Sequence, residues 1–192
     1  MEWKLFDENN PEFARPEWYE NIESAHHLEE DHHRERIITA LDFVHTAISM
    51  GGKSVVDLGC GDGGLLALLK ENNIEAWGYD LMPKNIDYAV NVRGVDARYT
   101  DFKNDEIIYA DIAVMTEVLE HLENPHEVVK NLPSKFLIAS SPYNETNTHH
   151  YEFHLWAWDN QGYIDLMHSG GYNVFNIKNV SGWSQIVLAV RD

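Results

Sequence analysis

The sequence has little cysteine, few basic residues and no long apolar run, and each shortage excludes a class of protein. Its single cysteine, Cys60, excludes a disulfide within the chain. No apolar run approaches the roughly 20 residues that a transmembrane helix needs, and the first residues do not form a signal peptide. We therefore expect a cytoplasmic protein that does not bind a membrane.

The shortage of basic residues bears on possible partners. The 192 residues include 14 lysines and arginines against 32 aspartates and glutamates, which gives a formal net charge of −18. A protein that binds long nucleic acid needs a basic stripe that displaces counterions from the phosphates, and no such stripe is visible. We therefore expect the partner to be a small molecule, a cationic group or another protein.

What the sequence does contain is a glycine-rich turn. Residues 55–58 predict a short buried strand, residues 65–70 predict the start of a helix, and the glycines between them force a tight turn. Gly59 and Gly61 stand where a Cβ would keep the backbone away from a ligand. The turn should therefore present bare main-chain N–H groups and a helix N-terminus to that ligand. Asp57 adds a carboxylate, which suits a ligand with a positive charge or an amino group.

A second acid stands where ribose recognition needs one. Asp80 follows the strand expected at residues 75–79 and lies about 20 residues past the glycines, the spacing at which an acid binds a ribose diol in such folds. Both NAD and S-adenosylmethionine (SAM) carry such a diol. Asp80 by itself therefore does not choose between these two cofactors.

Three motifs together resemble class I SAM-dependent methyltransferases. They stand in that family's order and at its spacing: Asp57-Leu58-Gly59-Cys60-Gly61, Gly78-Tyr79-Asp80 and Thr116-Glu117-Val118-Leu119-Glu120-His121. The resemblance covers roughly residues 50–190. It implies SAM as the cofactor, S-adenosylhomocysteine (SAH) as the product, and methyl transfer to an acceptor as the reaction.

The resemblance also assigns roles in cofactor binding. Gly59 and Gly61 would approach the amino-acid part of SAM, and Asp57 would help to hold its ammonium group. Asp80 would bind the ribose hydroxyls. The remaining residues implied for this site are Leu81 and Met82 beside the adenine, Asp101 and Phe102 as an acid and an aromatic wall for the adenine, Asp96 as a rival for that acid, and Glu117 near the sulfonium.

Short apolar runs alternate with helical patterns from residue 54 onward, which indicates βαβ units around a parallel sheet. The expected strands are residues 54–58, 75–79, 95–99, 112–115, 136–139, 173–178 and 185–190, and the expected helices lie near residues 64–72, 84–90, 125–131 and 160–168. A short turn joins the last two strands, so these should pair antiparallel. We therefore predict an α/β, Rossmann-like methyltransferase fold with a mostly parallel seven-stranded sheet and a C-terminal antiparallel hairpin.

Residues 1–50 are expected to form an N-terminal helical cap or extension on the SAM-binding domain of residues 51–192, within one structural unit. Ile37, Leu41, Val44 and Ile48 fall on one face of a helix, which we expect to pack on the sheet edge. Histidines also cluster at positions 26, 27, 32 and 33. Two interpretations of this cluster stay open: a solvated, acid-rich helix connection, or a lid that closes over the substrate.

We expect methyl transfer to a hydroxyl or amine of a small-molecule acceptor. If the acceptor is a hydroxyl, a general base helps, and histidine has a suitable pKa. One candidate is His121. The others lie in the polar segment of residues 140–159, which follows the fifth expected strand and is rich in His and Trp. Within it His150 is the first choice, His149 its neighbour and rival, and His154 a further candidate, with Trp156 and Trp158 as aromatic walls.

Two alternatives remain at this stage. Glu117, Glu120 and His121, with His150 downstream, resemble the metal-binding set of small-RNA 3′-terminal 2′-O-methyltransferases, in which a divalent ion activates the terminal ribose hydroxyl. The missing basic surface argues against RNA, so a metal-free site is favoured. The other alternative is a non-catalytic regulatory module that binds SAM.

Overall fold

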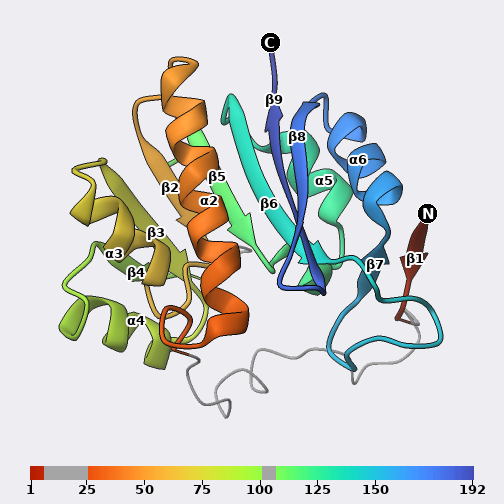
Figure 1. Cartoon of the computed structure of the whole chain (residues 1–192), viewed down its shortest axis with the longest axis horizontal. Coiled ribbons are helices and arrows are strands. Elements are labelled where there is room, and N and C mark those ends of the chain that lie inside the picture. The colour runs from red at the N-terminus through yellow and green to blue at the C-terminus, as the bar shows by residue number, and fades with distance from the viewer. Residues whose placement is uncertain (7–25, 101–106) are drawn as a thin grey trace.

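A seven-stranded sheet forms the centre of the protein. The computed structural model describes residues 1–6, 26–100 and 107–192, and within them the strand order is β4-β3-β2-β5-β6-β9-β8 (Figure 1). The strands are β2 (Val55–Leu58), β3 (Ala76–Asp80), β4 (Ala97–Tyr99), β5 (Ile112–Thr116), β6 (Phe136–Pro142), β8 (Asn173–Val180) and β9 (Ser184–Val190). All the neighbouring pairs are parallel except those made by β9, which runs antiparallel to β6 and β8.

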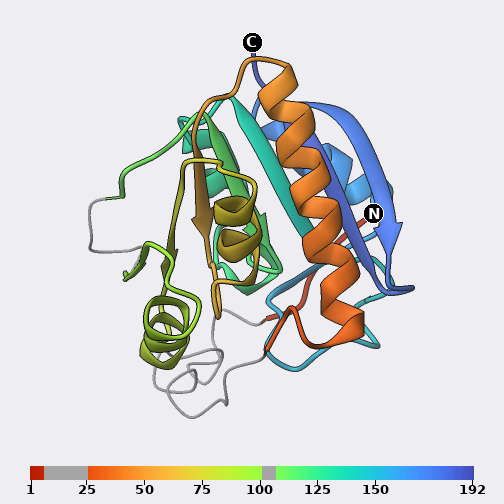
Figure 2. The ribbon, with the colours of Figure 1, turned by 60° about the vertical axis from the view of Figure 1, so that its left-hand side comes forward.

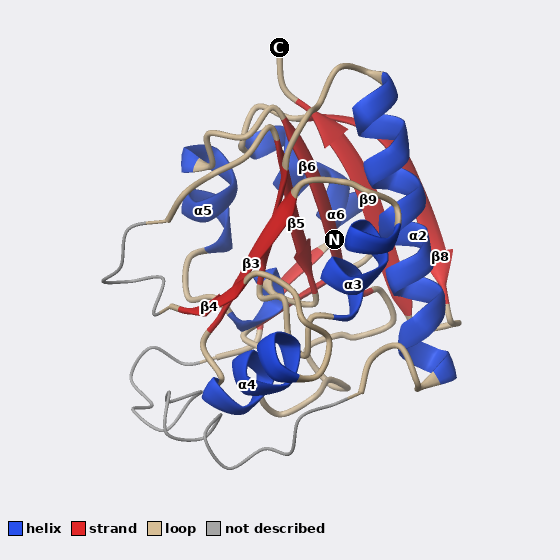
Figure 3. Ribbon diagram, turned by 90° about the vertical axis from the view of Figure 1, so that its left-hand side faces the viewer, coloured by secondary structure: helices blue, strands red, loops and turns tan. Residues whose placement is uncertain are grey.

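Helices cover both faces of this sheet. Helices α2 (Asp31–Ser49) and α3 (Gly64–Glu71) pack on one face, and α5 (Pro125–Asn131) and α6 (Asn160–Ser169) pack on the other (Figure 3). Helix α4 (Pro83–Asn91) lies beside β3 and β4. Each layer has its own apolar core, because strands such as β2 and β6 are buried along their whole length and expose side chains to both faces.

The predicted fold class is confirmed, including the C-terminal antiparallel hairpin of β8 and β9. Each strand and helix expected after residue 50 is present within about three residues of its expected bounds, which is the ordinary uncertainty of such boundaries. The local sequence pattern was enough to predict these strands and helices, because each apolar run is short and bounded by glycine or polar residues. Most of these runs are also followed by apolar residues at helical spacing.

The position predicted for the N-terminal helix is wrong. Helix α2 does not pack on the sheet edge; it runs across one face and contacts β5, β6 and β9 (Figure 2). Its side chains of Ile37, Phe43 and Val44 belong to the core that includes Phe136 of β6. The physical reason is the short length of α3. Its eight residues cover only part of that face, so central strands that are apolar on both sides need a second helix.

A small two-stranded sheet was not expected. Strand β1 (Glu2–Lys4) pairs antiparallel with β7 (Trp156–Trp158). The indole of Trp158 is fully buried, and its Nε1 donates to Oε2 of Glu2 at 2.7 Å. Trp158 therefore belongs to the protein core and does not form the aromatic wall of a substrate site.

The carboxyl ends of β2, β3, β5 and β6 meet at one edge of the sheet, the lower edge in Figure 1. A one-turn 3-10 helix, η1 (Leu119–His121), follows β5 at this edge. Ligands bind at the carboxyl edge in open α/β sheets, so this edge is where the candidate site residues are to be sought. Among the described residues, no helix combines the length and apolar character needed to cross a membrane.

Candidate functional site

The glycine turn connects β2 to α3 at the carboxyl edge. Gly59 and Gly61 have φ angles of +86° and +53°. A Cβ on Gly59 would lie 2.4 Å from Cγ2 of Val118, and a Cβ on Gly61 would lie 3.0 Å from Cε1 of His27. Both positions therefore combine a left-handed backbone with a close neighbour, and glycine satisfies both conditions.

Most amide groups of this turn are not bare, which contradicts the expectation from sequence in part. The amides of Gly59 and Cys60 donate to the carbonyl of Tyr79 at 2.8 and 2.9 Å, and the amide of Gly61 donates to Oδ2 of Asp80 at 2.8 Å. The amide of Gly64, at the start of α3, lies 3.3 Å from Oδ1 of Asp62. Acidic side chains have taken the place of an anionic ligand, so the turn suits a neutral or cationic group.

Asp57 lies beneath this turn and lacks a hydrogen-bond partner for one oxygen. The residue is 2% exposed, and among the described residues its Oδ1 accepts no hydrogen bond. Burial, and then the carboxyls of Asp80 and Asp62, together raise the pKa of Asp57 to about 7. An ammonium group placed here would satisfy the oxygen and restore the carboxylate.

Asp80 ends β3 beside Asp57. Its Oδ1 accepts from the amide of Met82 at 2.8 Å and from Nδ2 of Asn85 at 3.2 Å, while Oδ2 accepts from Gly61. Burial raises the pKa of Asp80 above its usual range even though these donors lower it. A carboxylate offers about four acceptor positions and three are used, so a ribose diol must displace one donor to make two bonds.

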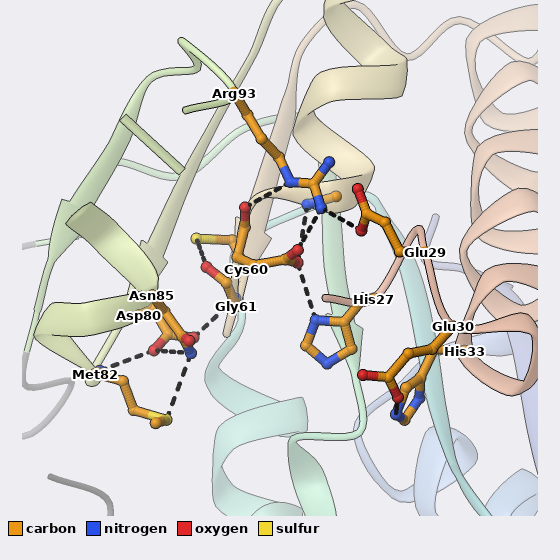
Figure 4. A network of polar contacts seen from close by, with 12 residues as sticks. His27, Glu29, Glu30, His33, Cys60, Gly61, Asp80, Met82, Asn85 and Arg93 are labelled. Carbon is orange, nitrogen blue, oxygen red and sulfur yellow. Dashed lines mark hydrogen bonds and ion pairs between the residues drawn. The ribbon is translucent and has the colours of Figure 1, made fainter. Parts of the chain in front are cut away.

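A polar network that sequence analysis missed fastens residues 26–30 to the glycine turn (Figure 4). Nδ1 of His27 lies 2.9 Å from Oδ1 of the fully buried Asp62. Arg93 also pairs with Asp62 and reaches Oε2 of Glu29 at 2.9 Å. Burial opposes the ionisation of Asp62, but the bonds from His27 and Arg93 outweigh it and hold its pKa below the usual value. The one feature of the sequence that could have indicated this network is an acid, Asp62, within the glycine turn.

The side chain of Glu117 projects from the end of β5. The residue has a φ of +54°, which is uncommon for a residue with a side chain. Its Oε1 accepts from the hydroxyls of Ser140 at 2.7 Å and Ser184 at 2.9 Å, and it lies 3.9 Å from Nη1 of Arg36. Three elements therefore hold this carboxylate in one orientation.

An acid and a histidine of η1 cluster with a second histidine from the segment between β6 and β7. The donor atoms of Glu120, His121 and His154 all lie within 4.8 Å of one another. Both carboxyl oxygens of Glu120 are buried and, in the described part of the chain, accept no hydrogen bond. Burial, and then Glu117, raise the pKa of Glu120 well above its usual range. Burial also lowers the pKa of His121 to about 4, so its ring is neutral at physiological pH.

His154 is fixed within this cluster by a second acid. Its Nδ1 lies 2.6 Å from Oε2 of Glu145, and its side chain is 9% exposed. His149 and His150, in contrast, are exposed, and Nδ1 of His150 bonds the carbonyl of Thr146 at 3.1 Å. The structure therefore brings His121 and His154 together but leaves His150 outside the cluster.

The other residues expected at the site fall in different places. Leu81 and Met82 are half-buried and follow Asp80 directly. Asp96 is exposed and its carboxylate is bound by Arg98 at 2.9 Å. Asp101 and Phe102 lie outside the described residues. Cys60 is buried, and burial raises the pKa of its thiol, so it is no nucleophile.

A cavity of about 370 Å³ adjoins the turn on the α5 side of the sheet. Its lining is mainly apolar and includes Leu58 of β2, Met115 of β5 and Tyr109. Val118, which touches Gly59, also lines it. The cavity therefore opens beside the carboxyl ends of β2 and β5 and can take a flat apolar group.

Known proteins resemble the chain in sequence and in fold. A family model described as a methyltransferase domain matches residues 30–159. The ubiquinone biosynthesis O-methyltransferase of Coxiella burnetii is 29% identical over 98 residues, which cover 47% of this chain and 42% of that protein. The match therefore spans less than half the length of this curated relative.

Solved structures extend the comparison to nearly the whole chain. The magnesium protoporphyrin IX methyltransferase of Synechocystis PCC 6803 with bound SAH has a TM-score of 0.67 at 17% identity, over 92% of both chains. The methyltransferase domain of bacterial CtHen1 has a TM-score of 0.64 at 21% identity, over 83% of this chain and 100% of that one. At these identities the structural likeness establishes a shared fold.

Proposed function

Because the chain belongs to the methyltransferase domain family and is a class I SAM-dependent methyltransferase, we propose that it methylates a hydroxyl or amine of a small-molecule acceptor. SAM, when bound, supplies a methyl group activated by the positive charge on its sulfur. The protein must then bind the cofactor, hold the acceptor in line with it, exclude water and remove a proton from the acceptor.

The residues of the glycine turn fit SAM. The unpartnered Oδ1 of buried Asp57 suits the ammonium of its amino-acid part, and the acidic surroundings of the turn suit a cationic ligand. Asp80 is our candidate for the ribose hydroxyls, beside Leu81 and Met82. The apolar cavity between β2, β5 and α5 suits the adenine ring. Glu117 would face the sulfonium, where its carboxylate stabilises positive charge.

A single observation supports proton removal: the pairing of His154 with Glu145. An ionised carboxylate only accepts hydrogen bonds, so Nδ1 of His154 carries the proton and Nε2 keeps its lone pair for the acceptor. The side chain is 9% exposed and therefore works in a site from which most water is excluded. This makes His154 our preferred base, with His121 beside it and His150 third.

A methyl-transfer assay tests the proposed function. Purified protein is incubated with SAM and a panel of phenols, sugars and amines, and both SAH and the methylated product are measured by mass spectrometry. We expect hydroxyl or amine acceptors to give a product, and His154→Ala to lower its rate. Transfer only to carbon or sulfur acceptors, or a rate that does not change in His154→Ala, would contradict the proposal.

The same cluster favours a second candidate, methyl transfer assisted by a divalent cation. Glu120, His121 and His154 offer one carboxylate and two imidazoles within 4.8 Å, and the oxygens of buried Glu120 have no partner among the described residues. Carboxylate and imidazole ligands suit metals such as Mn²⁺ or Zn²⁺. Glu145 would then orient His154 from behind, as such acids commonly do for metal-bound histidine.

Chelation distinguishes the two candidates. If His154 acts as a base without metal, turnover survives EDTA. If a cation is required, EDTA abolishes turnover, added Mg²⁺, Mn²⁺ or Zn²⁺ restores it, and Glu120→Gln reproduces the loss. SAH affinity should remain unchanged in both cases, which separates loss of the cation from loss of the cofactor.

A further inference from the structure

Arg36 is a buried arginine that the proposed reaction does not use. It lies near the start of α2, is 3% exposed, and directs its guanidinium toward Glu117 at the carboxyl edge of the sheet. Its Nη1 lies 3.2 Å from Nδ1 of His33. Its Nε is buried without a hydrogen-bond partner, and Nη2 also forms no hydrogen bond within the described residues. The buried guanidinium thus has one unpaired edge, which is formed by Nε and Nη2.

Among the described residues, no neighbouring acid forms a hydrogen bond with this edge of the guanidinium. Oε1 of Glu117 lies 3.9 Å from Nη1, beyond hydrogen-bond length, and already accepts from two serine hydroxyls. The adjacent acid, Glu35, points elsewhere, since its Oε2 accepts from the amide of Ser181 at 2.7 Å and from its hydroxyl at 3.1 Å. Within the described residues, no acid therefore forms a hydrogen bond with the guanidinium, although Glu120 lies near enough to interact with it electrostatically.

Two further described residues beside Arg36 are aromatic and uncharged. The guanidinium carbon lies 5.4 Å from the ring centroid of Trp183, and the ring of His33 lies 6.1 Å from the same ring. Burial, and then Arg36 itself, lower the pKa of His33 to about 3, so its imidazole is neutral at physiological pH. These rings shield the guanidinium from water, and shielding strengthens its attraction for an anion.

The unpaired edge has the geometry of a carboxylate site. The Nε and Nη2 hydrogens of a guanidinium point the same way and match the two oxygens of a carboxylate in a bidentate pair. A charge buried without such a partner is costly, so the site gains most from an anion that arrives with the ligand. We propose that Arg36 binds a carboxylate of the methyl acceptor, and that the enzyme selects acceptors bearing one.

This assignment rests on the proposed function, because Nη1 of Arg36 lies 3.9 Å from Glu117, the residue proposed to face the sulfonium. It also explains how a protein with a net charge of −18 binds an acidic substrate. The long-range field repels such a ligand, whereas a single shielded arginine attracts it at short range. Arg36 would act as a specificity residue and would not take part in proton transfer.

Binding of benzoate and benzamide tests the proposal without knowledge of the acceptor. Both probes have the same ring and nearly the same shape, and only benzoate is an anion. Titration of the SAH complex by calorimetry or ligand-observed NMR should show benzoate binding at least tenfold tighter than benzamide. Arg36→Gln should abolish this preference, and Arg36→Lys should keep only part of it, because a lysine does not form the bidentate pair.

Arg98→Gln is the matched control, since Arg98 is exposed, already paired with Asp96, and should not change the preference. SAH affinity and thermal unfolding show whether each variant is folded. If Arg36→Gln does not fold, the proposal is tested by whether the unaltered protein binds benzoate more tightly than benzamide. Equal binding of the two probes, no binding of benzoate, or a preference that survives in folded Arg36→Gln overturns the proposal. Failure of the acceptor panel alone would concern only the proposed function, because the benzoate preference needs no turnover.

Discussion

Nδ1 of His154 and Oε2 of Glu145 lie 2.6 Å apart, and both residues belong to the segment that joins β6 to β7. The acid fixes the tautomer and the orientation of the ring, as paired acids do for catalytic and metal-binding histidines. The pairing distinguishes His154 from its exposed neighbours His149 and His150, which the sequence alone ranked above it.

The histidines of this segment should differ in their effects on turnover. We expect His154→Ala to lower the single-turnover rate at least tenfold, equivalent to about 1.4 kcal/mol of barrier, with SAM affinity nearly unchanged. His150→Ala, an exposed substitution in the same segment, is the control and should keep a near-normal rate. A larger loss in His150→Ala than in His154→Ala would return the catalytic role to His150.

Removing the carboxylate of Asp80 should weaken cofactor binding. Asp80→Ala loses charge-assisted bonds to the ribose, so we expect a loss of roughly 1.5–3 kcal/mol in SAM binding, about 10- to 150-fold. Calorimetry on the folded variant measures it. Asp96→Ala removes an exposed acid that Arg98 binds and should leave the affinity unchanged. Normal affinity in Asp80→Ala would show that the cofactor does not lie at the end of β3.

Asp57 should make cofactor binding depend on pH. Its pKa is raised to about 7 by burial and then by Asp80 and Asp62, so below pH 7 the ligand-free protein carries a proton there. An ammonium partner requires the carboxylate, so SAH affinity should rise as pH increases from about 5.5 to 7.5, with proton release on binding. Calorimetry in buffers of different ionisation enthalpy measures that proton. Asp57→Asn should bind more weakly and without this pH dependence; a flat profile in the unaltered protein excludes Asp57 as the partner.

Asp57 should also lower the free energy of unfolding of the ligand-free protein. The unfolded chain ionises Asp57 near pH 4, whereas the folded protein keeps its proton until about pH 7, so this group lowers stability as pH rises through that interval. Asp57→Asn should therefore raise the free energy of unfolding at pH 8 by a few kcal/mol, on the order of 1.4 kcal/mol per unit of the pKa shift. Urea unfolding at pH 4 and pH 8 tests this, and the gain should vanish at the lower pH.

The network around Asp62 predicts unequal effects for two partners of one ion pair. Arg93→Ala leaves the fully buried Asp62 with His27 and the amide of Gly64, and should cost on the order of 2–4 kcal/mol of unfolding free energy. Glu29 is 55% exposed, so Glu29→Ala should cost less than about 1 kcal/mol. Urea unfolding of both variants at pH 7 compares them. Equal losses would mean that the exposed arm of the network, and not Asp62, fastens residues 26–30 to the turn.

The sequence predicted those parts of the fold and site that depend on local pattern. Buried runs such as residues 55–58 and 112–116, each followed by a helical period, define the order of strands and helices. The glycines and Asp57 carry their own signal, because a left-handed turn accepts few other residues and because an acid in a buried strand requires an explanation. Asp80 was recognised by its distance from the turn.

Contacts between distant residues gave no such signal. Asp62 meets Arg93 and His27 across 31 and 35 positions, and nothing local marks the three as partners. Spacing likewise cannot show which of several nearby histidines points inward; the choice of His154 follows from the position of Glu145. The buried role of Trp158 depends on β1, whose three residues are too few to form a recognisable pattern.

The pairing of β1 with β7 also constrains how the chain folds as it is synthesised. Glu2 contacts Trp158 across 156 positions, so β1 has no partner until β7 has been synthesised. The seven-stranded sheet has a similar requirement, because β9, near the end of the chain, inserts between β6 and β8. Closing such long loops is entropically expensive and slows folding. Until β9 has been synthesised, β6 therefore presents an open strand edge, and chaperone binding during synthesis would protect it.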